Sequence, residues 1–198
     1  MYRPKFLDRL PRPWRIAIDW IVTIVAAVAI VLLVKAYVVN PYRIPSPSME
    51  PTLHCGKPQP GCRARFSDRV LANRFIYHFR DPKRSEIVVF HAPAAAAQDC
   101  GSGGTYVKRI IGLPGEVLSE RKGQVFIDGK ALSEPYVPAS ERDHQTRRWG
   151  PIPANHYFMM GDNRVQSCDS RVWGPVDRSA LIGPVFFVYW PPNRIGFR

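Results

Sequence analysis

The sequence predicts a mostly-β domain that follows one membrane-spanning helix. Among the 198 residues, 20 are proline and 14 are glycine, a composition that favours short strands and many turns over helices. After residue 39, short apolar runs end at turn signals, and no long stretch repeats the period of about 3.6 residues that marks an amphipathic helix. Near the N-terminus, one apolar run is long enough to cross a bilayer. With 45% hydrophobic residues, the chain can build a substantial core in one domain of ordinary size.

The predicted membrane helix covers residues 16–38. Its apolar part, Ile16–Val34, contains a single charge, Asp19, and at about 1.5 Å per residue it nearly spans a hydrocarbon core of about 30 Å. The run is longer than the roughly 7–15 apolar residues of a secretory signal peptide, and no small-x-small cleavage site follows it. We therefore expect a retained anchor.

Charge asymmetry orients this anchor. Residues 1–15 form a basic tail, with five Lys or Arg side chains against one aspartate, and basic tails stay in the cytoplasm. We therefore expect a single-pass protein of the cell membrane, with residues 39–198 as an extracytoplasmic domain. A later apolar run, Leu181–Trp190, is too short to span and is interrupted by Pro184, so it is predicted as a strand.

The chain is strongly basic, with 28 Lys and Arg against 16 Asp and Glu and a net charge of +12. It contains no Cys/His finger, no RNP-like aromatic motif and no basic recognition helix, so we expect no nucleic-acid partner. Anionic membrane lipid is the better partner, at roughly 1 kcal/mol per nearby Lys or Arg. The sequence carries no signal for oligomeric state.

The first elements of the domain are two strands. Glu86–Phe90 is typical of a buried strand, and Thr105–Ile111 is predicted as a second strand that ends at the turn Gly112–Gly115. The small residues of Ala92–Gly104 are predicted to form a loop between them.

The later elements continue the β pattern. Residues 124–132 are predicted as a hairpin, because Asp128-Gly129 can supply the positive φ angles of a tight turn. The stretch Glu134–Pro153 is polar and is predicted to be irregular. Tyr157–Met160 and Leu181–Tyr189 are predicted as strands.

The segment Ile44–Leu53 is the first candidate for chemistry. Its prolines at positions 45, 47 and 51 fix backbone φ angles and remove donors, which excludes a helix interior or a central strand. A stiff segment is a good mount for a small reactive side chain, because little conformational freedom remains to be lost. Ser48 lies in the middle, and Ser46 supplies a second hydroxyl. Taken alone, the segment could also be a Pro/Ser linker behind an anchor.

A serine nucleophile needs a base nearby. The five histidines have neither metal-binding spacing nor the setting of a Ser-His-Asp triad, and only His91, after a buried strand, stays a candidate. Strand alternation places Lys108 on one face with Tyr106 and Ile110. Such burial lowers the pKa of an ammonium, and the neutral amine can then take the serine proton. The alternative is an exposed Lys-Arg pair on an edge strand.

A third polar stretch runs from Gly161 to Arg171. Its small residues and opposite charges suit a hydrogen-bonded loop, in which Asp169 and Arg171 pair and Ser167 reaches toward the lysine. The alternative is a solvated turn.

The four cysteines suit neither zinc nor a C-x-x-C redox pair. Cys55 and Cys62 bracket a loop of turn formers, and outside the cytoplasm we expect them to form a disulfide, which leaves Cys100 and Cys168 as the second pair. Three connectivities are possible for four cysteines, and free buried thiols are the alternative.

Three motifs, in this order, resemble the boxes of bacterial type I signal peptidases, also called leader peptidases, a family of serine proteases with a Ser/Lys dyad. The motifs are Ser48-Met49-x-Pro51-Thr52, Lys108-Arg109-Ile110-x-Gly112-x-Pro114-Gly115-Glu116 and Gly161-Asp162-Asn163-Arg164-x-x-Ser167-x-Asp169-Ser170-Arg171. One such box is a weak signal, whereas three in order behind an N-terminal anchor are specific and cover the exported domain from end to end.

The resemblance implies a membrane-anchored serine endopeptidase that removes signal peptides from exported preproteins after a small-x-small site. Ser48 would be the nucleophile and Lys108 the general base. The Ser46 hydroxyl and the Ser48 backbone N–H would form the oxyanion hole. The signal peptide would bind as an added β-strand with shallow pockets for its small side chains.

The family also implies supporting residues and a fold. Ser167 would orient the lysine amine, and Asp169 and Arg171 would hold their loop. The expected fold has strongly bent antiparallel sheets and a small β insert, here residues 116–150.

Two alternatives stay open. One is a specialised processing protease of the same mechanism, which matures a pilin or a conjugation protein. The other is a non-catalytic, membrane-anchored β module that binds peptides, although such a binder has no use for an amine beside a hydroxyl. The sequence contains no cofactor or metal motif, so we expect neither. The small residues of Ala92–Ala97 also offer small-x-small sequences at which the enzyme could cleave itself.

Overall fold

A computed structural model describes residues 11–37, 39–101 and 103–198, and these divide into two compact units at the boundary between residues 39 and 40. Most of the predicted basic tail, residues 1–10, therefore lies outside the described residues. The first unit is helix α1 (Arg12–Tyr37), which begins earlier than the predicted anchor. Its stretch Arg12–Leu33 has a mean hydropathy of 2.7 and no part of it is buried, which is typical of a helix made for a lipid environment.

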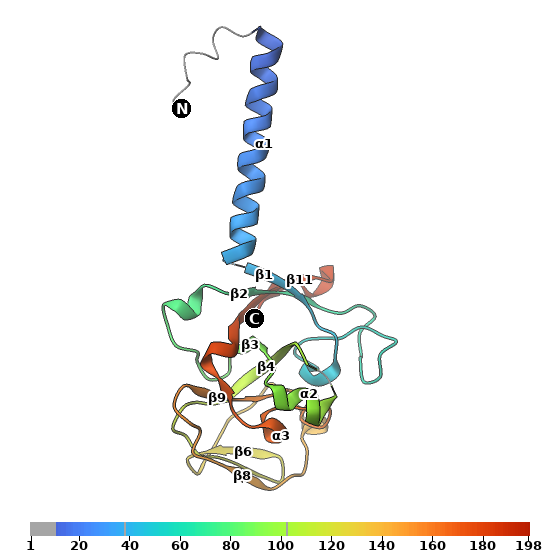
Figure 1. Ribbon diagram of the computed structural model, residues 1–198. Coiled ribbons are helices and arrows are strands. Elements are labelled where there is room, and N and C mark those ends of the chain that lie inside the picture. The colour runs from blue at the N-terminus through green and yellow to red at the C-terminus, as the bar shows by residue number, and fades with distance from the viewer. Residues whose placement is uncertain (1–10, 38, 102) are drawn as a thin grey trace. The chain divides into compact units, whose positions relative to one another are not determined.

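The second unit contains an eight-stranded sheet, as the prediction of a mostly-β domain requires (Figure 1). Its strand order is β1-β2-β11-β3-β4-β9-β10, with β12 added to β11. The strands are β1 (Val39–Arg43), β2 (Arg69–Asn73), β3 (Ile87–His91), β4 (Thr105–Gly112), β9 (His156–Met160), β10 (Val176–Asp177), β11 (Leu181–Trp190) and β12 (Gly196–Phe197).

Strand β11 bends this sheet. Its first half pairs antiparallel with β3 and its second half with β2, and the register shifts in both pairings. Gly183 allows the bend, because a Cβ there would lie 2.0 Å from the carbonyl oxygen of Asn73. Such irregularities curve a sheet. The expected strongly bent antiparallel sheet is thus confirmed.

A smaller sheet of four strands forms from residues within 116–150. The strands are β5 (Leu118–Arg121), β6 (Gln124–Ile127), β7 (Lys130–Ala131) and β8 (Arg147–Trp149), in the order β7-β6-β5-β8. The predicted turn is present, with φ of 49° at Asp128 and 80° at Gly129. Strand β8 lies in the stretch predicted to be irregular, because two charged residues and one aromatic residue give no strand pattern by themselves.

The prediction of a loop over Ala92–Gly104 is wrong in part. Helix α2 (Ala94–Cys100) forms there, since alanine has the highest helix propensity, and it ends at Gly101 in the left-handed conformation with φ of 68°. It lies beside helix α3 (Ser170–Trp173), as Figure 1 shows. The 3₁₀ helices are η2 (Pro47–Met49), η3 (Ile76–His78), η4 (Ala139–Glu141), η5 (Arg178–Ala180) and η6 (Pro192–Arg194).

Three apolar clusters form the core and position the rest. The first, around Ile44, Leu53 and Val89, lies beneath the Pro/Ser segment. The second lies around Phe90 and Ile110 on the other face of the large sheet. The third includes residues of both sheets and joins the small sheet to the large one.

Candidate active site

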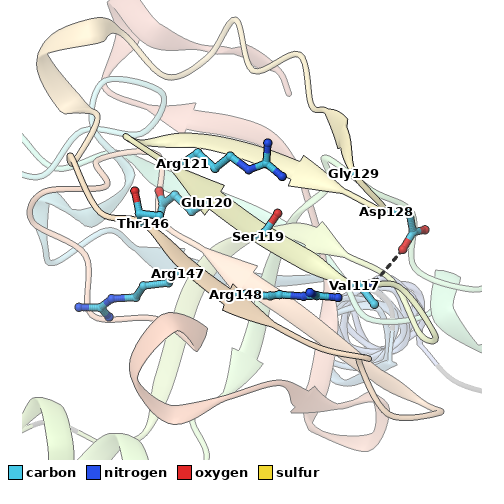
Figure 2. A pocket seen from close by; sticks show the side chains of 9 residues that line it. All are labelled: Val117, Ser119, Glu120, Arg121, Asp128, Gly129, Thr146, Arg147 and Arg148. Carbon is cyan, nitrogen blue, oxygen red and sulfur yellow. Dashed lines mark hydrogen bonds between the residues drawn. The ribbon is translucent and has the colours of Figure 1, made fainter.

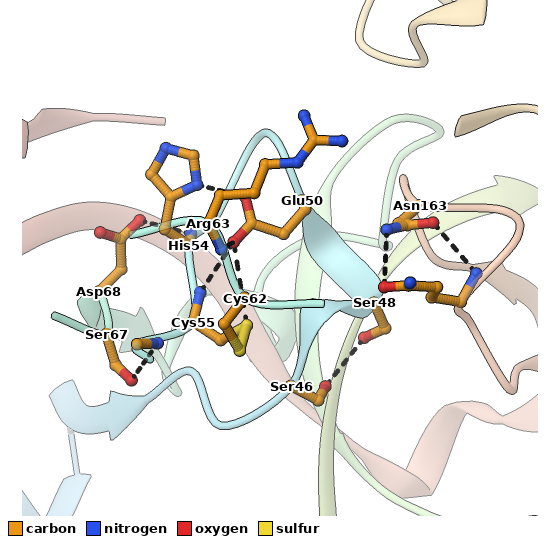
Figure 3. The surroundings of a disulfide bond; sticks show 12 residues. Ser46, Ser48, Glu50, His54, Cys55, Cys62, Arg63, Ser67, Asp68 and Asn163 are labelled. Carbon is orange, nitrogen blue, oxygen red and sulfur yellow. Dashed lines mark hydrogen bonds and ion pairs between the residues drawn. A yellow bond between two sulfur atoms is a disulfide. The ribbon is translucent and has the colours of Figure 1, made fainter. Parts of the chain in front are cut away.

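The Pro/Ser segment is folded rather than a free linker. Ile44, Met49 and Leu53 are buried in the first core cluster and hold it at three points. Ser48 lies in η2 and is 6% exposed. Its carbonyl oxygen accepts a hydrogen bond of 3.1 Å from the Asn163 backbone N–H, and its Oγ lies 3.2 Å from Ser46 Oγ (Figure 3).

Lys108 comes to this serine from β4. The side chain is 1% exposed, and its Nζ donates to Ser48 Oγ at 2.6 Å. The Tyr106 ring, 5.2 Å from Nζ, lies on the same side, as strand alternation predicts. Burial lowers the pKa of Lys108 to about 8, although the charge of Asp169 opposes this effect. A neutral amine in contact with a hydroxyl is the pair that a Ser/Lys mechanism requires.

Asp169 organises the loop behind the lysine. It is fully buried and accepts hydrogen bonds from the Gly161 N–H at 3.0 Å, from Ser167 Oγ at 2.7 Å and from the guanidinium of Arg171. Burial alone raises the pKa of a carboxyl, but the charge of Arg171 and these hydrogen bonds outweigh it and lower the pKa of Asp169. The loop is therefore an internally bonded unit and not a solvated turn.

A second buried ion pair joins three segments of the site. Arg109 donates to Asp162 through Nε at 2.8 Å and stacks over the Tyr136 ring, 3.9 Å from its centre. The Thr52 hydroxyl donates to the same carboxylate. Asp162 therefore connects the serine segment, β4 and the 161–171 loop. Sequence reasoning missed this role, although Thr52, Arg109 and Asp162 all lie within the three motifs.

Glu50 is a further buried group that sequence reasoning missed. Its Oε1 accepts from the backbone N–H of Cys55 at 3.2 Å and of Arg63 at 3.3 Å, and its Oε2 contacts His54 Nδ1 (Figure 3). It thus fixes the loop 55–62 to the segment that carries Ser48. Nothing in the sequence marks it, because its partners are mostly backbone groups.

The structure pairs all four cysteines. Cys55 bonds to Cys62 across 5.0 Å between Cα atoms, and Cys100 bonds to Cys168 across 6.1 Å. The second disulfide joins the end of α2 to the 161–171 loop.

The alternative base is placed away from the serine contact. His91 is exposed at the end of β3, opposite Thr105, whereas the described hydrogen bonds of Ser48 Oγ are with Lys108 and Ser46. Within the described ranges, no group of three or more His, Cys, Asp or Glu could hold a metal ion.

Two hollows on this unit differ in their lining residues. One, of about 300 Å³, lies at the dyad; it is lined by Tyr42, Arg43, Ile44, Pro45, Ser46, Ser48, Met49, Gly103, Thr105, Tyr106, Val107 and Lys108. The other, of about 640 Å³, lies on the small sheet and is lined largely by polar and charged residues of β5 and β8 (Figure 2).

The hollow at the dyad has an open strand edge. Strand β3 pairs with β4 along Thr105–Arg109, whereas β9 pairs with β4 only from Arg109 onward. The other side of residues 105–108 therefore faces the hollow, where an extended peptide could add as a strand beside Ser48.

Comparison with known proteins gives one consistent family. The family model described as signal peptidase, peptidase S26, matches residues 17–190. A signal peptidase I from Leptolyngbya laminosa is 38% identical over 181 residues, which cover 90% of this chain and 82% of the relative. Signal peptidase I from Bacillus amyloliquefaciens is 35% identical over 187 residues, covering 90% of each chain. A solved signal peptidase I from Enterococcus faecalis is 32% identical, with a TM-score of 0.45, and covers 53% of this chain and 97% of that one.

Proposed function

The chain belongs to the signal peptidase family, peptidase S26, and from this premise we propose that Ser48 is the nucleophile and Lys108 the general base of a membrane-anchored signal peptidase. The substrates are the signal peptides of preproteins. The observation that carries the assignment is the contact of 2.6 Å between Lys108 Nζ and Ser48 Oγ, both buried.

The reaction starts with the hydroxyl of Ser48. Its oxygen attacks the scissile carbonyl carbon while Lys108, unprotonated, takes the proton. The tetrahedral oxyanion then accepts from the Ser46 hydroxyl and the Ser48 backbone N–H. Two features support this pair of donors: the Ser46 hydroxyl lies beside Ser48 Oγ, and Ser48 lies in the first turn of η2, where N–H groups have no intrahelical acceptor.

The leaving amine takes the proton from Lys108, and an acyl-enzyme on Ser48 remains. Lys108, neutral again, then activates the water that hydrolyses the ester. Asp169, held by Arg171 and Ser167, supports the lysine position from behind.

The hollow of about 300 Å³ supports a preference for small side chains in the substrate. A peptide paired to β4 would point alternate side chains into this space, which matches a small-x-small site.

The orientation in the membrane is also proposed. Arg12 and Arg15 precede the apolar part of α1, which favours a cytoplasmic N-terminus, and anionic lipid is the expected partner of such flanking charges. Two disulfides support an oxidising compartment for residues 40–198. Protease added to intact spheroplasts should digest this unit, and full protection would contradict the orientation.

The deciding experiment incubates the full-length enzyme with a preprotein and determines the new N-terminus. We expect cleavage after a small-x-small site, abolished in both Ser48→Ala and Lys108→Ala. The matched controls are Ser133→Ala and Lys130→Ala, two exposed positions, which should cleave like the wild type. Appreciable turnover by Ser48→Ala would show that another residue is the nucleophile. Turnover by Lys108→Ala would show that another residue, such as His91, is the base.

A further inference from the structure

Glu120 is a buried acid that the proposed mechanism does not use. It lies on β5 of the small sheet, where alternation places it on the same face as the buried Leu118. It also borders the hollow that Ser119 and Arg121 line on this sheet (Figure 2). The residue is fully buried, and neither carboxyl oxygen has a hydrogen-bond partner within the described part of the chain. A buried carboxylate without a donor is costly, so this position needs an explanation.

The nearest explanation is a second carboxyl group. The Asp143 carboxyl lies close enough to hydrogen-bond Glu120 once one of the two carries a proton. Two ionised carboxylates can only accept, which is why neither finds a donor in the other. The arrangement therefore fits an acid and a carboxylate that share one proton.

The groups near Glu120 form a network of ion pairs. Asp143, Arg171 and Arg164 are the charged groups that act on Glu120. Arg171 pairs with Asp143 and Asp169, and Arg164 pairs with Glu134, which Arg142 also contacts. From β8, Arg147 lies opposite Glu120 but is exposed, and His144 beside Asp143 is exposed as well. A proton on Glu120 removes the repulsion between its carboxyl and that of Asp143.

Burial, followed by the charge of Asp143, raises the pKa of Glu120 to about 7, whereas the guanidiniums of Arg171 and Arg164 act in the opposite direction. This direction agrees with the burial of Glu120 and with its missing donors.

The shared proton is connected to the proposed dyad by a chain of contacts. Asp143 accepts from Nη1 of Arg171, and the same guanidinium donates through Nε to Asp169 at 2.8 Å. Asp169 in turn accepts from Ser167 and from the Gly161 N–H, on the loop whose Asn163 N–H holds the carbonyl of Ser48. Arg171 thus joins the segment before β8, which carries Asp143, to the dyad loop.

We propose that Glu120 is a positioning residue: its protonated carboxyl donates to Asp143, and this shared proton keeps Arg171 aligned on Asp169 and the 161–171 loop in place behind Lys108. This inference rests on the proposed function of the dyad. When Glu120 ionises, two carboxylates compete for Arg171, and the loop loosens. The kcat should therefore fall as pH rises through the ionisation of Glu120, a decrease that deprotonation of Lys108 does not explain.

The test compares full-length wild type with Glu120→Gln, whose amide can donate to Asp143 but cannot ionise. We expect similar kcat at pH 6.5 and a ratio of wild-type to variant kcat that falls about 3- to 10-fold by pH 9, with KM little changed. Arg121→Gln, on the exposed face of the same strand, is the matched control and should keep the wild-type profile. Superimposable profiles for wild type and Glu120→Gln would overturn the positioning role.

A second readout does not depend on the dyad. In the Ser48→Ala background, the unfolded chain releases the Glu120 proton near the ordinary pKa of glutamate, about 4.5, whereas the folded chain keeps it until about pH 7. The Tm of the protein that retains Glu120 should therefore fall over this window relative to the Tm of the Glu120→Gln variant. Above the window, the difference between the two Tm values should be constant.

Asp143→Asn in the same background should move the upper end of that window toward lower pH, because the charge that raises the pKa of Glu120 in the folded chain is gone. A Tm difference independent of pH, unchanged by Asp143→Asn, would show that Glu120 binds no extra proton and would overturn the inference. If the Tm window appears but Ser48→Ala still cleaves preprotein, the proposed dyad fails while the proton on Glu120 stands.

Discussion

Lys108 and Glu120 are both fully buried, yet their surroundings differ. Lys108 lies beside an aromatic ring with a hydroxyl as its direct partner, whereas Glu120 lies beside a second carboxyl, that of Asp143, and two guanidiniums. Burial favours the neutral form in both cases, which lowers the pKa of the lysine and raises that of the acid. The same physical cause, burial, therefore favours a neutral amine at Lys108 and a protonated carboxyl at Glu120.

The largest expected effect concerns the base. Lys108→Arg keeps the cation but cannot supply a neutral amine, because a guanidinium does not deprotonate in proteins. We expect single-turnover cleavage to slow by at least about 1000-fold at every pH from 7 to 10. The control Lys130→Arg, on exposed β7, should keep its rate. Recovery of activity by Lys108→Arg at high pH would contradict a neutral-amine base.

A smaller effect concerns the stability cost of the buried lysine. A pKa of Lys108 lowered to about 8 means that the unfolded chain binds one more proton than the folded chain between about pH 8 and 10.5. Wild-type stability should therefore rise with pH over this window, and below it the buried lysine costs on the order of 3 kcal/mol. Lys108→Met, which keeps the volume, should have a higher Tm than wild type at pH 7.

That difference in Tm should shrink between pH 8 and 10.5. Calorimetry in detergent across this range measures it, with Lys130→Met as a control for loss of an exposed charge. A wild type that is as stable as Lys108→Met at pH 7 would mean that the lysine is solvated or fully paired.

The smallest effect lies at Asp162, where the serine segment, β4 and the 161–171 loop meet. Thr52→Val keeps the shape but removes the donor to Asp162, which also binds Arg109, and should cost about 1 kcal/mol in denaturant unfolding. Thr52→Ser restores the hydroxyl and should recover most of that loss. Equal stability of Thr52→Val and wild type would show that Asp162 needs only the arginine.

The parts of the fold that depend on local pattern could be predicted from the sequence. The strand that carries Lys108 follows from alternation, the hairpin turn from Asp128-Gly129, and the anchor from its apolar run. Helix α2 lies where small residues suggest a loop, although a run of alanines favours a helix. Strand β8 has no pattern of its own and exists only by pairing with β5.

The site divides in the same way. Ser48, Lys108 and the 161–171 loop lie in motifs with distinct residue types, so the sequence points to them. Glu50 and Glu120 become visible only in three dimensions, because a glutamate is usually exposed and its burial depends on distant partners. For Glu120 the decisive neighbour, Asp143, lies in a stretch without sequence pattern.

Titration of Lys108 itself tests the neutral-amine base most directly. Full-length Ser48→Ala, with isotope-labelled lysine side chains, can be followed by NMR from pH 6 to 11, and the Lys108→Met spectrum identifies the resonance. We expect a midpoint near 8 for this amine, well below that of exposed lysines. A midpoint near the free-lysine value of about 10.4 would contradict a neutral amine at the dyad.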